Sequence, residues 1–332
     1  MLKEDLNALL HVAKPFRYLT VDELDRMAAY CDIVTFNDGD IILRQGEKSK
    51  GLYIVLEGKA FLSAKVLGSD LLDLATVDKG DFVGEVGLMV DMPNSMSVIA
   101  KGNITCLFIT KLYFDTLALF LGEIKYKINQ AIMEEVCARL TRIHAKITEL
   151  MSHSAMATRS IFSEVIHSLT LPKVIDFADI DMDISELKKR DFFNLLTQEE
   201  LTVLLNESTL IETAPHNTLI KTGDSDSPVF VLLCGAVQSR VIKDNKIAKV
   251  SVLSPINLIS SFFPMGVAAV FDYSTCEQAV LLKINRAHLL HLKENNIHLW
   301  YKIVDLICRE FLFLEIAANK LFIRLQSELY NR

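Results

Sequence analysis

The sequence predicts an α+β fold made of two small jelly-roll β-barrels, each followed by a long closing α-helix. Three observations predict it. The chain contains an internal repeat, each copy has short apolar segments punctuated by glycine, and each copy ends in a helix with heptad spacing. Short strands that turn at glycines are typical of jelly-roll barrels, and a repeat this long indicates domain duplication rather than a solenoid.

The repeat aligns residues 16–24 with 193–201 and residues 33–58 with 210–235, without a gap in either pair. With 332 residues, the chain is long enough for two domains that each bury a core. We therefore predict a first domain over residues 1–168, a linker over 169–189 and a second domain over 190–332.

Each copy opens with a short helix that carries its own start signal. Thr20 is the expected N-cap of the first helix, and Glu23 stands three positions later. Thr197 and Glu200 repeat the pattern in the second copy. A threonine followed at this spacing by glutamate forms a capping box, so both copies should begin with a helix at the same place.

Short strands follow the capped helix in each copy. They are rich in Val, Ile, Leu and Phe, and Leu52–Gly58 aligns with Val229–Gly235. Glycines mark the expected corners between strands in the first copy, because glycine tolerates the backbone angles that tight turns need. These glycines are Gly39, Gly46, Gly51, Gly58, Gly68 and Gly80.

A candidate anion-binding turn lies within Gly80–Val98. A Gly84-Glu85 pair opens a short apolar helical turn, and Pro93 stops it. Backbone amides at the start of such a turn suit an anion, and a carboxylate can accept a hydrogen bond from a sugar hydroxyl. A guanidinium would normally complete such a site, and none is present in this segment. The candidate ligand-binding residues are Gly84, Glu85, Val86, Gly87, Leu88, Asn94 and Ser95.

The closing helices carry heptads that predict helix pairing. The first seam runs through Val136, Leu140, Ile143, Ile147, Leu150, Ser154, Ala157 and Ile161. The second runs through Val304, Ile307, Phe311, Leu314, Ala318, Leu321 and Leu325. The pairing could join two chains as a homodimeric coiled coil, or join the two helices of one chain as an internal pseudo-dimer. The alternative is that each seam is only a wide stripe facing its own barrel.

The joint between the copies, Lys173–Lys189, contains an acidic run over residues 176–183. Such a run is typical of a solvated linker, and the sharper alternative is a strip that docks a partner.

The composition excludes several classes. A net charge of −7 argues against nucleic acid as the main partner, since phosphate contacts need clustered Lys and Arg. No secretory signal or membrane span is evident, and the six cysteines form no CxxC pair, so we expect reduced thiols in a cytoplasmic protein. His288 and His291 stand three apart, but no further ligand completes a metal site, and we expect no metal and no cofactor.

Taken together, the strands, glycine corners, Gly-Glu turn and closing helix resemble the cyclic-nucleotide-binding domain family. Its members include the sensor domains of catabolite-activator-type transcription factors and protein kinase A regulatory subunits. The resemblance covers about residues 15–166 clearly and about residues 190–332 more weakly. It implies that Gly84–Leu88 is the family's phosphate-binding cassette, and that Asn94 stands where the family has an arginine.

The neutral amide of Asn94 has less reach than a guanidinium and carries no charge, so the resemblance implies weakened nucleotide binding. Arg44 or Lys48 could compensate from the preceding loop, or could lie on the surface. In the second copy, Ser260 and Ser261 stand where Gly-Glu would be.

The second copy departs further from the family's pattern. No arginine lies between Ser260 and Lys283, and Phe262 and Phe263 could fill the pocket themselves. We therefore expect no functional nucleotide site in the second copy.

Two rival functions fit poorly. A transcription factor would need a helix-turn-helix after a closing helix, and the sequence leaves no room for one. An enzyme would need a nucleophile or phosphate-loop motif, and none is present.

We expect a bacterial-type, non-enzymatic adaptor or regulatory protein that acts through protein contacts and helix pairing. Its expected partners are other proteins, a larger assembly among them. The alternative is a ligand-responsive signalling regulator whose first barrel binds a cyclic mono- or dinucleotide and whose helices transmit the change.

Overall fold

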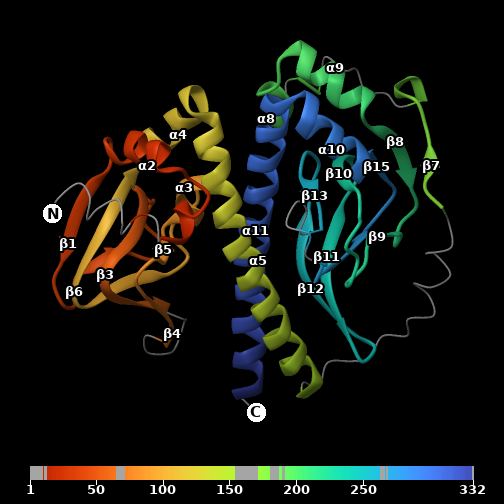
Figure 1. The fold of residues 1–332 in the computed structure, drawn as a ribbon. Coiled ribbons are helices and arrows are strands. Elements are labelled where there is room, and N and C mark those ends of the chain that lie inside the picture. The colour runs from red at the N-terminus through yellow and green to blue at the C-terminus, as the bar shows by residue number, and fades with distance from the viewer. Residues whose placement is uncertain are drawn as a thin grey trace. The chain divides into compact units, whose positions relative to one another are not determined.

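The computed structural model describes most of the chain. The described residues are 10, 13–64, 72–153, 171–179, 187–188, 191–261, 266 and 268–330. They form two antiparallel β-domains, each followed by a long helix, which confirms the predicted α+β fold class (Figure 1).

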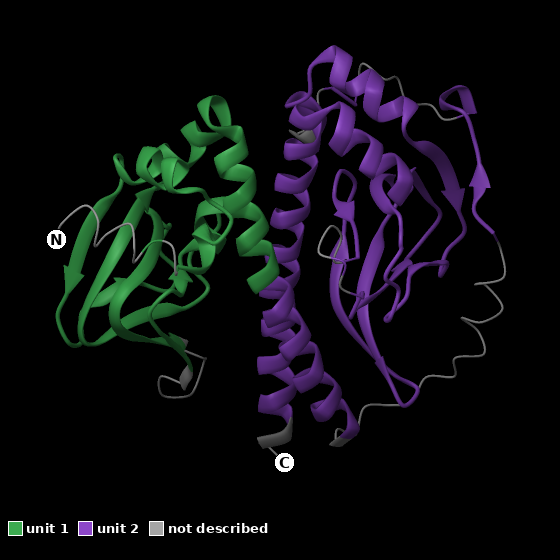
Figure 2. Ribbon diagram, viewed as in Figure 1, with its two compact units in different colours: residues 1–135 green, residues 136–332 purple. Residues whose placement is uncertain are grey.

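The chain divides into two compact units, residues 1–135 and 136–332 (Figure 2). The boundary falls inside the first closing helix, so the C-terminal half of that helix belongs to the second unit. The predicted division at residues 168 and 190 stays a prediction, since residues 154–170 lie outside the described part of the chain.

The first unit holds one sheet and its helices. Its strands run in the order β1-β6-β3-β4, with β2 paired to β6 and β5 paired to β3, all antiparallel. A buried cluster that includes Val55, Val98 and Cys106 forms its core. The elements that begin in this unit are η1 (Lys14–Phe16), α2 (Val21–Ala28), β1 (Asp32–Phe36), β2 (Ile41–Leu43), β3 (Gly51–Ala64), β4 (Leu72–Val77), β5 (Phe82–Val83), α3 (Glu85–Val90), β6 (Ser97–Thr110), α4 (Lys111–Phe120) and α5 (Gly122–His153).

The second unit holds two sheets. One has the order β13-β10-β15-β8-β7 and the other β12-β11-β14-β9. The elements are β7 (Lys173–Val174), η2 (Phe177–Asp179), α8 (Asp191–Asn194), α9 (Gln198–Asn206), β8 (Thr209–Thr213), β9 (Thr218–Ile220), β10 (Val229–Cys234), β11 (Val237–Lys243), β12 (Lys246–Leu253), β13 (Leu258–Ile259), β14 (Asp272–Thr275), β15 (Ala279–Ile284), α10 (Arg286–Asn295) and α11 (Ile297–Tyr330).

Part of the expected linker contributes to a sheet. In β7, Lys173 pairs with Glu212 and Val174 with Ile211, so this short strand extends the edge of β8. The sequence pattern missed this strand, because two residues are too few to show an alternating pattern. Residues 180–186, which hold half of the acidic run, lie outside the described residues.

Both expected capping boxes are present, and each is tied to its closing helix. Thr20 and Glu23 cap α2 reciprocally, and Thr197 and Glu200 cap α9 in the same way. Lys127 Nζ lies 2.7 Å from Glu23 Oε1 in the first copy. Lys302 Nζ of α11 lies 2.7 Å from Glu200 Oε2 in the second. The duplicated ion pair fixes the opening helix of each copy to its closing helix.

These ion pairs give stability that depends on pH. Burial raises the pKa of Glu23 and of Glu200, but hydrogen bonds from the lysine and from the capping threonine outweigh it, so both pKa values lie below 4.5. A carboxylate whose pKa is lowered by folding stabilises the fold at neutral pH, and this stabilisation is lost as pH falls through the folded-state pKa.

Lys302→Met should therefore lower the free energy of unfolding by about 1 kcal/mol at pH 7, with the loss shrinking as the solution becomes acidic. Urea unfolding at several pH values would measure it. Lys320→Met, which removes an exposed lysine from the same helix, is the matched control and should change little. A loss that stays constant from neutral to acidic pH would contradict the ion-pair explanation.

Candidate functional site

The Gly-Glu turn of the first copy joins β5 to the six-residue helix α3. Gly84 is the N-cap of α3 and has φ of +97°, a left-handed conformation that glycine adopts readily. A Cβ at this position would lie 2.6 Å from the backbone oxygen of Gly51. The backbone therefore demands glycine here whether or not a ligand binds.

The second glycine of the turn allows close packing. A Cβ on Gly87 would lie 2.4 Å from Cβ of Ser49, which is itself buried in the preceding loop. The Ser49 hydroxyl donates a 2.9 Å hydrogen bond to the backbone oxygen of Gly51. At the end of α3, Lys111 Nζ donates to the backbone oxygen of Leu88 at 3.1 Å. These contacts hold α3 against its own domain.

The other predicted residues of the turn differ in exposure. Glu85 is only 7% exposed and Leu88 is buried, whereas Val86 is half-buried and Ser95 is exposed. Glu85 is thus the first residue of α3, at the end of the helix where the backbone dipoles are positive.

Asn94 occupies the position where the resemblance places an arginine, and its polar groups are engaged within the loop. Its side-chain Nδ2 donates to the backbone oxygen of Arg44 at 3.2 Å. Its backbone N–H donates to Glu47 O at 2.8 Å, and its carbonyl accepts from Gly46 N–H at 2.9 Å. Asn94 is 7% exposed. The amide therefore fastens the β2–β3 loop, a role that the sequence did not reveal.

The two cations considered as substitutes lie at the surface. Arg44 Nε forms a 3.3 Å ion pair with Glu47 Oε1, and both side chains are more than half exposed. Lys48 is exposed as well. The exposure of Arg44 and Lys48 thus matches the alternative in which these two cations lie on the protein surface.

The corresponding turn of the second copy is identified by its hydrogen bonds. Ala269 donates to Asp224 O at 2.8 Å and accepts from Gly223 N–H at 2.7 Å, which repeats the backbone pattern of Asn94. Ala269 thus takes the place of Asn94, so this copy has neither arginine nor amide there. The sequence alignment did not extend to this position.

The rest of this turn has also diverged. Ser260 and Ser261 are buried, and the Ser260 hydroxyl donates to the Ser261 backbone oxygen at 2.6 Å. Ile256 has φ of +78°, a strained conformation for a β-branched residue. Phe262 and Phe263, considered as pocket fillers, lie outside the described residues.

The predicted helix-pairing residues are mostly buried, and charged side chains beside the seam also link the two helices. In the second unit, α5 and α11 contact each other through an ion pair and a cation–ring contact. Arg139 forms a two-pronged ion pair with Glu315, with Nε–Oε1 of 2.6 Å and Nη2–Oε2 of 3.0 Å. Lys146 Nζ lies 5.5 Å from the ring centre of Phe322. Buried seam residues are Val136, Leu140, Ile143, Ile147, Val304, Ile307, Phe311, Leu314 and Leu321, and Leu150 is half-buried.

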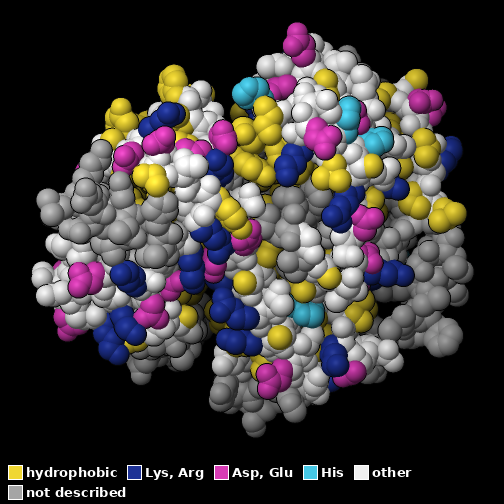
Figure 3. All heavy atoms as spheres, viewed as in Figure 1, with side chains coloured by type: hydrophobic (Ala, Val, Ile, Leu, Met, Phe, Trp, Pro, Cys, Tyr) yellow, Lys and Arg dark blue, Asp and Glu magenta, His cyan; other side chains and the backbone are white. Residues whose placement is uncertain are grey.

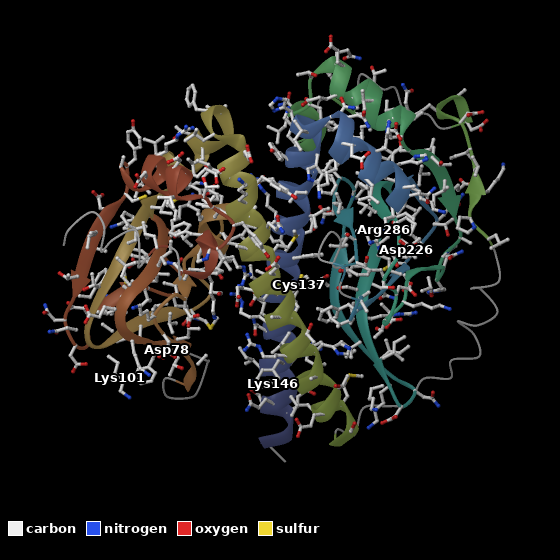
Figure 4. All side chains as sticks on the ribbon, in the orientation of Figure 1. Asp78, Lys101, Cys137, Lys146, Asp226 and Arg286 are labelled. Carbon is white, nitrogen blue, oxygen red and sulfur yellow. The ribbon has the colours of Figure 1, made fainter. Side chains whose placement is uncertain are left out.

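Both contacts lie one heptad apart on each helix, so the two helices run in the same direction. Figure 4 labels Lys146 on α5, and Figure 2 shows the purple half of α5 beside α11. This arrangement corresponds to the internal pairing considered from sequence. Pairing between two chains is untested, and Ser154, Ala157 and Ile161 lie outside the described residues.

The candidate histidines are engaged by one glutamate. His288 Nδ1 lies 2.7 Å from the backbone oxygen of Glu207, and His291 Nδ1 lies 2.9 Å from Glu207 Oε1. Within the described ranges, no cluster of His, Cys, Asp or Glu has an arrangement that could hold a metal ion.

The surface and the helices add two observations. On the face shown in Figure 3, acidic and basic side chains are interspersed over both units rather than gathered by sign. Across the part of the chain that the structure describes, no helix combines the length and apolar character needed to cross a bilayer.

Comparison with known proteins finds a family match within the first copy. Residues 33–119 match the family model of the cyclic nucleotide-binding domain. A cAMP-dependent protein kinase regulatory subunit of Dictyostelium discoideum is 28% identical over 117 residues, which are 34% of this chain and 34% of that protein. cGMP-dependent protein kinase 2 of Homo sapiens is 28% identical over 114 residues, which are 34% of this chain and 15% of that kinase. The matched segment thus spans about a third or less of these relatives.

Solved structures are similar over longer stretches at lower identity. The regulatory subunit of a cAMP-independent protein kinase A from Trypanosoma brucei covers 93% of both chains at 17% identity, with a TM-score of 0.32. The Thermus thermophilus catabolite activator protein covers 46% of this chain and 78% of its own at 19% identity, with a TM-score of 0.35. The family match is therefore to residues 33–119, a segment of the first copy that is similar to the cyclic nucleotide-binding domain.

Proposed function

We propose that this chain is a non-enzymatic adaptor or regulatory protein built on two degenerate cyclic nucleotide-binding domains. It acts through protein contacts, and its paired closing helices give those contacts a fixed geometry. The observation that carries the proposal is that neither copy has a cation at the position where the family has an arginine. Asn94 donates its amide to the Arg44 backbone, and Ala269 has no polar side chain at all.

The physical argument concerns the single charge of a cyclic phosphodiester. A guanidinium can make two charge-assisted hydrogen bonds to such a group, whereas the Asn94 amide is neutral and already gives one of its two N–H donors to the backbone oxygen of Arg44. Losing a hydrogen bond to a charged group costs about 1.5–3 kcal/mol. That cost corresponds to roughly 10- to 100-fold weaker binding.

A second candidate function is a ligand-responsive regulator whose first copy binds a cyclic mono- or dinucleotide. The position of Glu85 favours it, because a buried acid is retained at the start of α3 beside Gly84. The second copy has Ser261 in the equivalent place, so this alternative concerns the first copy only.

Calorimetry on the full chain with cyclic AMP, cyclic GMP and cyclic di-GMP distinguishes the two functions. We expect the natural sequence to give no saturable heat at micromolar ligand. Asn94→Arg should restore a cation beside Glu85 and strengthen binding by about 10- to 100-fold. Ala269→Arg in the second copy is the matched control and should give no gain, since no acid accompanies it there.

Micromolar binding by the natural sequence, lost on Glu85→Ala, would overturn the adaptor proposal and favour the regulator. Thermal unfolding of each variant shows whether the absence of a binding heat comes from the altered site or from loss of the fold.

A further inference from the structure

Large apolar side chains are exposed on α2 and α4 of the first unit. Leu112 lies in the first turn of α4, and Leu119 and Phe120 lie at its end. Val21 begins α2, and Tyr30 follows shortly after its last residue. These five side chains are between 53% and 80% exposed, and hydrophobic side chains are visible at this end of the first unit in Figure 3. We call the five residues the α2–α4 surface.

Two contacts show that α2 and α4 lie side by side. At one end, the ring centre of Tyr30 lies 5.4 Å from that of Tyr113, in the first turn of α4. At the other end, Lys127 Nζ lies 2.7 Å from Glu23 Oε1 of α2 and 2.9 Å from Glu123 Oε1, three residues beyond α4. The two helices are therefore antiparallel neighbours (Figure 1), and their exposed side chains form one surface.

The second copy has the same two helices but a polar surface. Its helices α9 and α10 correspond to α2 and α4. The first helix of each pair has the same capping box, and the second ends on a residue with nearly the same backbone, with φ of −137° at Leu121 and −139° at Asn296. The copies can therefore be compared residue by residue. In place of Val21, Tyr30, Leu112, Leu119 and Phe120, the second copy has Gln198, Glu207, Ala287, Glu294 and Asn295.

The contact between the two helices differs between the copies in the same way. In the second copy, Glu207 Oε2 lies 3.5 Å from His288 Nδ1 and Glu207 Oε1 lies 2.9 Å from His291 Nδ1. In the first copy, the rings of Tyr30 and Tyr113 meet at the aligned positions. Because the same fold forms with polar residues, folding does not explain why the first copy exposes apolar ones. Exposed apolar side chains that gather in this way mark an interaction surface.

The size of the α2–α4 surface fits a contact between two copies of this chain. A large aromatic side chain buries about 150–250 Å² in a contact, so five mostly exposed apolar side chains offer roughly 500–700 Å². A two-fold contact uses the same surface on both protomers, which brings the buried total to roughly 1,000–1,400 Å². Specific interfaces begin at about 1,000–1,200 Å², so this surface is large enough for a dimer.

The charges at the two ends of α2 and α4 also favour a second copy. One end carries more acid than base, and the opposite end carries more base than acid. The first end holds Asp22, Glu23 and Glu123 with Lys125 and Lys127, the second holds Arg26, Lys50 and Lys111 with Asp32 and Asp115, and Asp25 lies between them. A two-fold axis across the helices brings the acidic end of each protomer to the basic end of the other. An anionic membrane would instead repel the acidic end.

We propose that the α2–α4 surface is a self-association interface, on which a second copy of this chain docks through the same surface about a two-fold axis. The apolar side chains of both protomers form the centre of the contact, and the charged ends form its rim. The interface uses none of the residues of the α5–α11 seam. It also does not depend on whether the first copy binds a nucleotide.

Sedimentation equilibrium of the full chain at micromolar concentrations tests the interface. The natural sequence should form a reversible dimer. The double variant Leu119→Glu with Phe120→Asn, which installs the residues of the second copy, should raise the dissociation constant of the dimer by at least about 100-fold. The effect is large because a two-fold contact loses each side chain twice. Both positions are exposed, so the variant should keep its fold, which thermal unfolding checks.

Leu290→Asp in α10 is the matched control. Leu290 is an exposed leucine of the second copy, and the residue aligned with it is Asp115, so this variant should leave the dimer unchanged. A natural chain that stays monomeric, or a dimer that survives in the double variant, overturns the proposal. Vesicles of phosphatidylcholine and phosphatidylserine that bind a monomeric natural chain but not the double variant would assign the surface to a membrane instead.

Discussion

Phe311→Asp is expected to lower the free energy of unfolding by more than about 4 kcal/mol, which would unfold the second unit under ordinary conditions. Phe311 is 2% exposed on α11. The substitution removes a large apolar side chain from a closely packed place and puts an uncompensated charge there. Urea unfolding followed by circular dichroism and by the emission of Trp300, the single tryptophan, would measure the loss.

The same helix offers a matched control two residues further on. Phe313 is 40% exposed, so Phe313→Asp should change the free energy of unfolding by only about 0.5 kcal/mol. Near-equal stability of the two variants would contradict the packing of α11. Light scattering adds a second result, because a folded Phe311→Asp variant with half the natural mass would favour pairing between chains.

Arg139→Ala is expected to cost about 2–4 kcal/mol of stability, because it leaves the carboxylate of Glu315 without its two-pronged partner. The Glu315 side chain is only 10% exposed, whereas that of Arg139 is 28% exposed. Water can therefore compensate the carboxylate only in part. A double-mutant cycle with Glu315→Ala, measured by urea unfolding, would isolate the interaction between the two side chains.

Arg142→Ala is the control for this pair, since Arg142 lies one turn away on α5 and is exposed. It should change stability by less than about 0.5 kcal/mol. A coupling energy near zero between positions 139 and 315 would show that α5 and α11 do not pair in solution as they do here. Replacing both residues with leucine should recover much of the stability, because well-packed apolar pairs often match buried ion pairs.

Much of the fold could be predicted because its signals are local. The capping box of Thr20 and Glu23 lies within one helical turn, and the need for glycine at position 84 comes from its backbone angle and from the strand beside it. Repetition strengthened each signal, since the same pattern in two places is unlikely to arise by chance. The missing arginine could also be predicted, because the fixed spacing from Gly84 to Pro93 locates the position.

The structural role of the Asn94 side chain could not be predicted, because its amide donates to a carbonyl fifty positions earlier in the chain. The site prediction therefore identified the residue but not its contacts. Ala269 was missed for a related reason. The gap-free alignment stops before it, and only the hydrogen bonds to Gly223 and Asp224 establish its place.

The sequence by itself determined the duplication, the fold class, the glycine turn and the loss of the family's cation, since these depend on spacing and on backbone conformation over a few residues. Tertiary structure alone decided that the second half of α5 belongs with α11, that Asn94 fastens a loop, and that Ala269 takes the place of Asn94 in the second copy. The physical reason is that burial and charge compensation depend on which distant segments of the chain come into contact. The same sequence pattern is compatible with several sets of contacts, and only the packed structure shows which set forms.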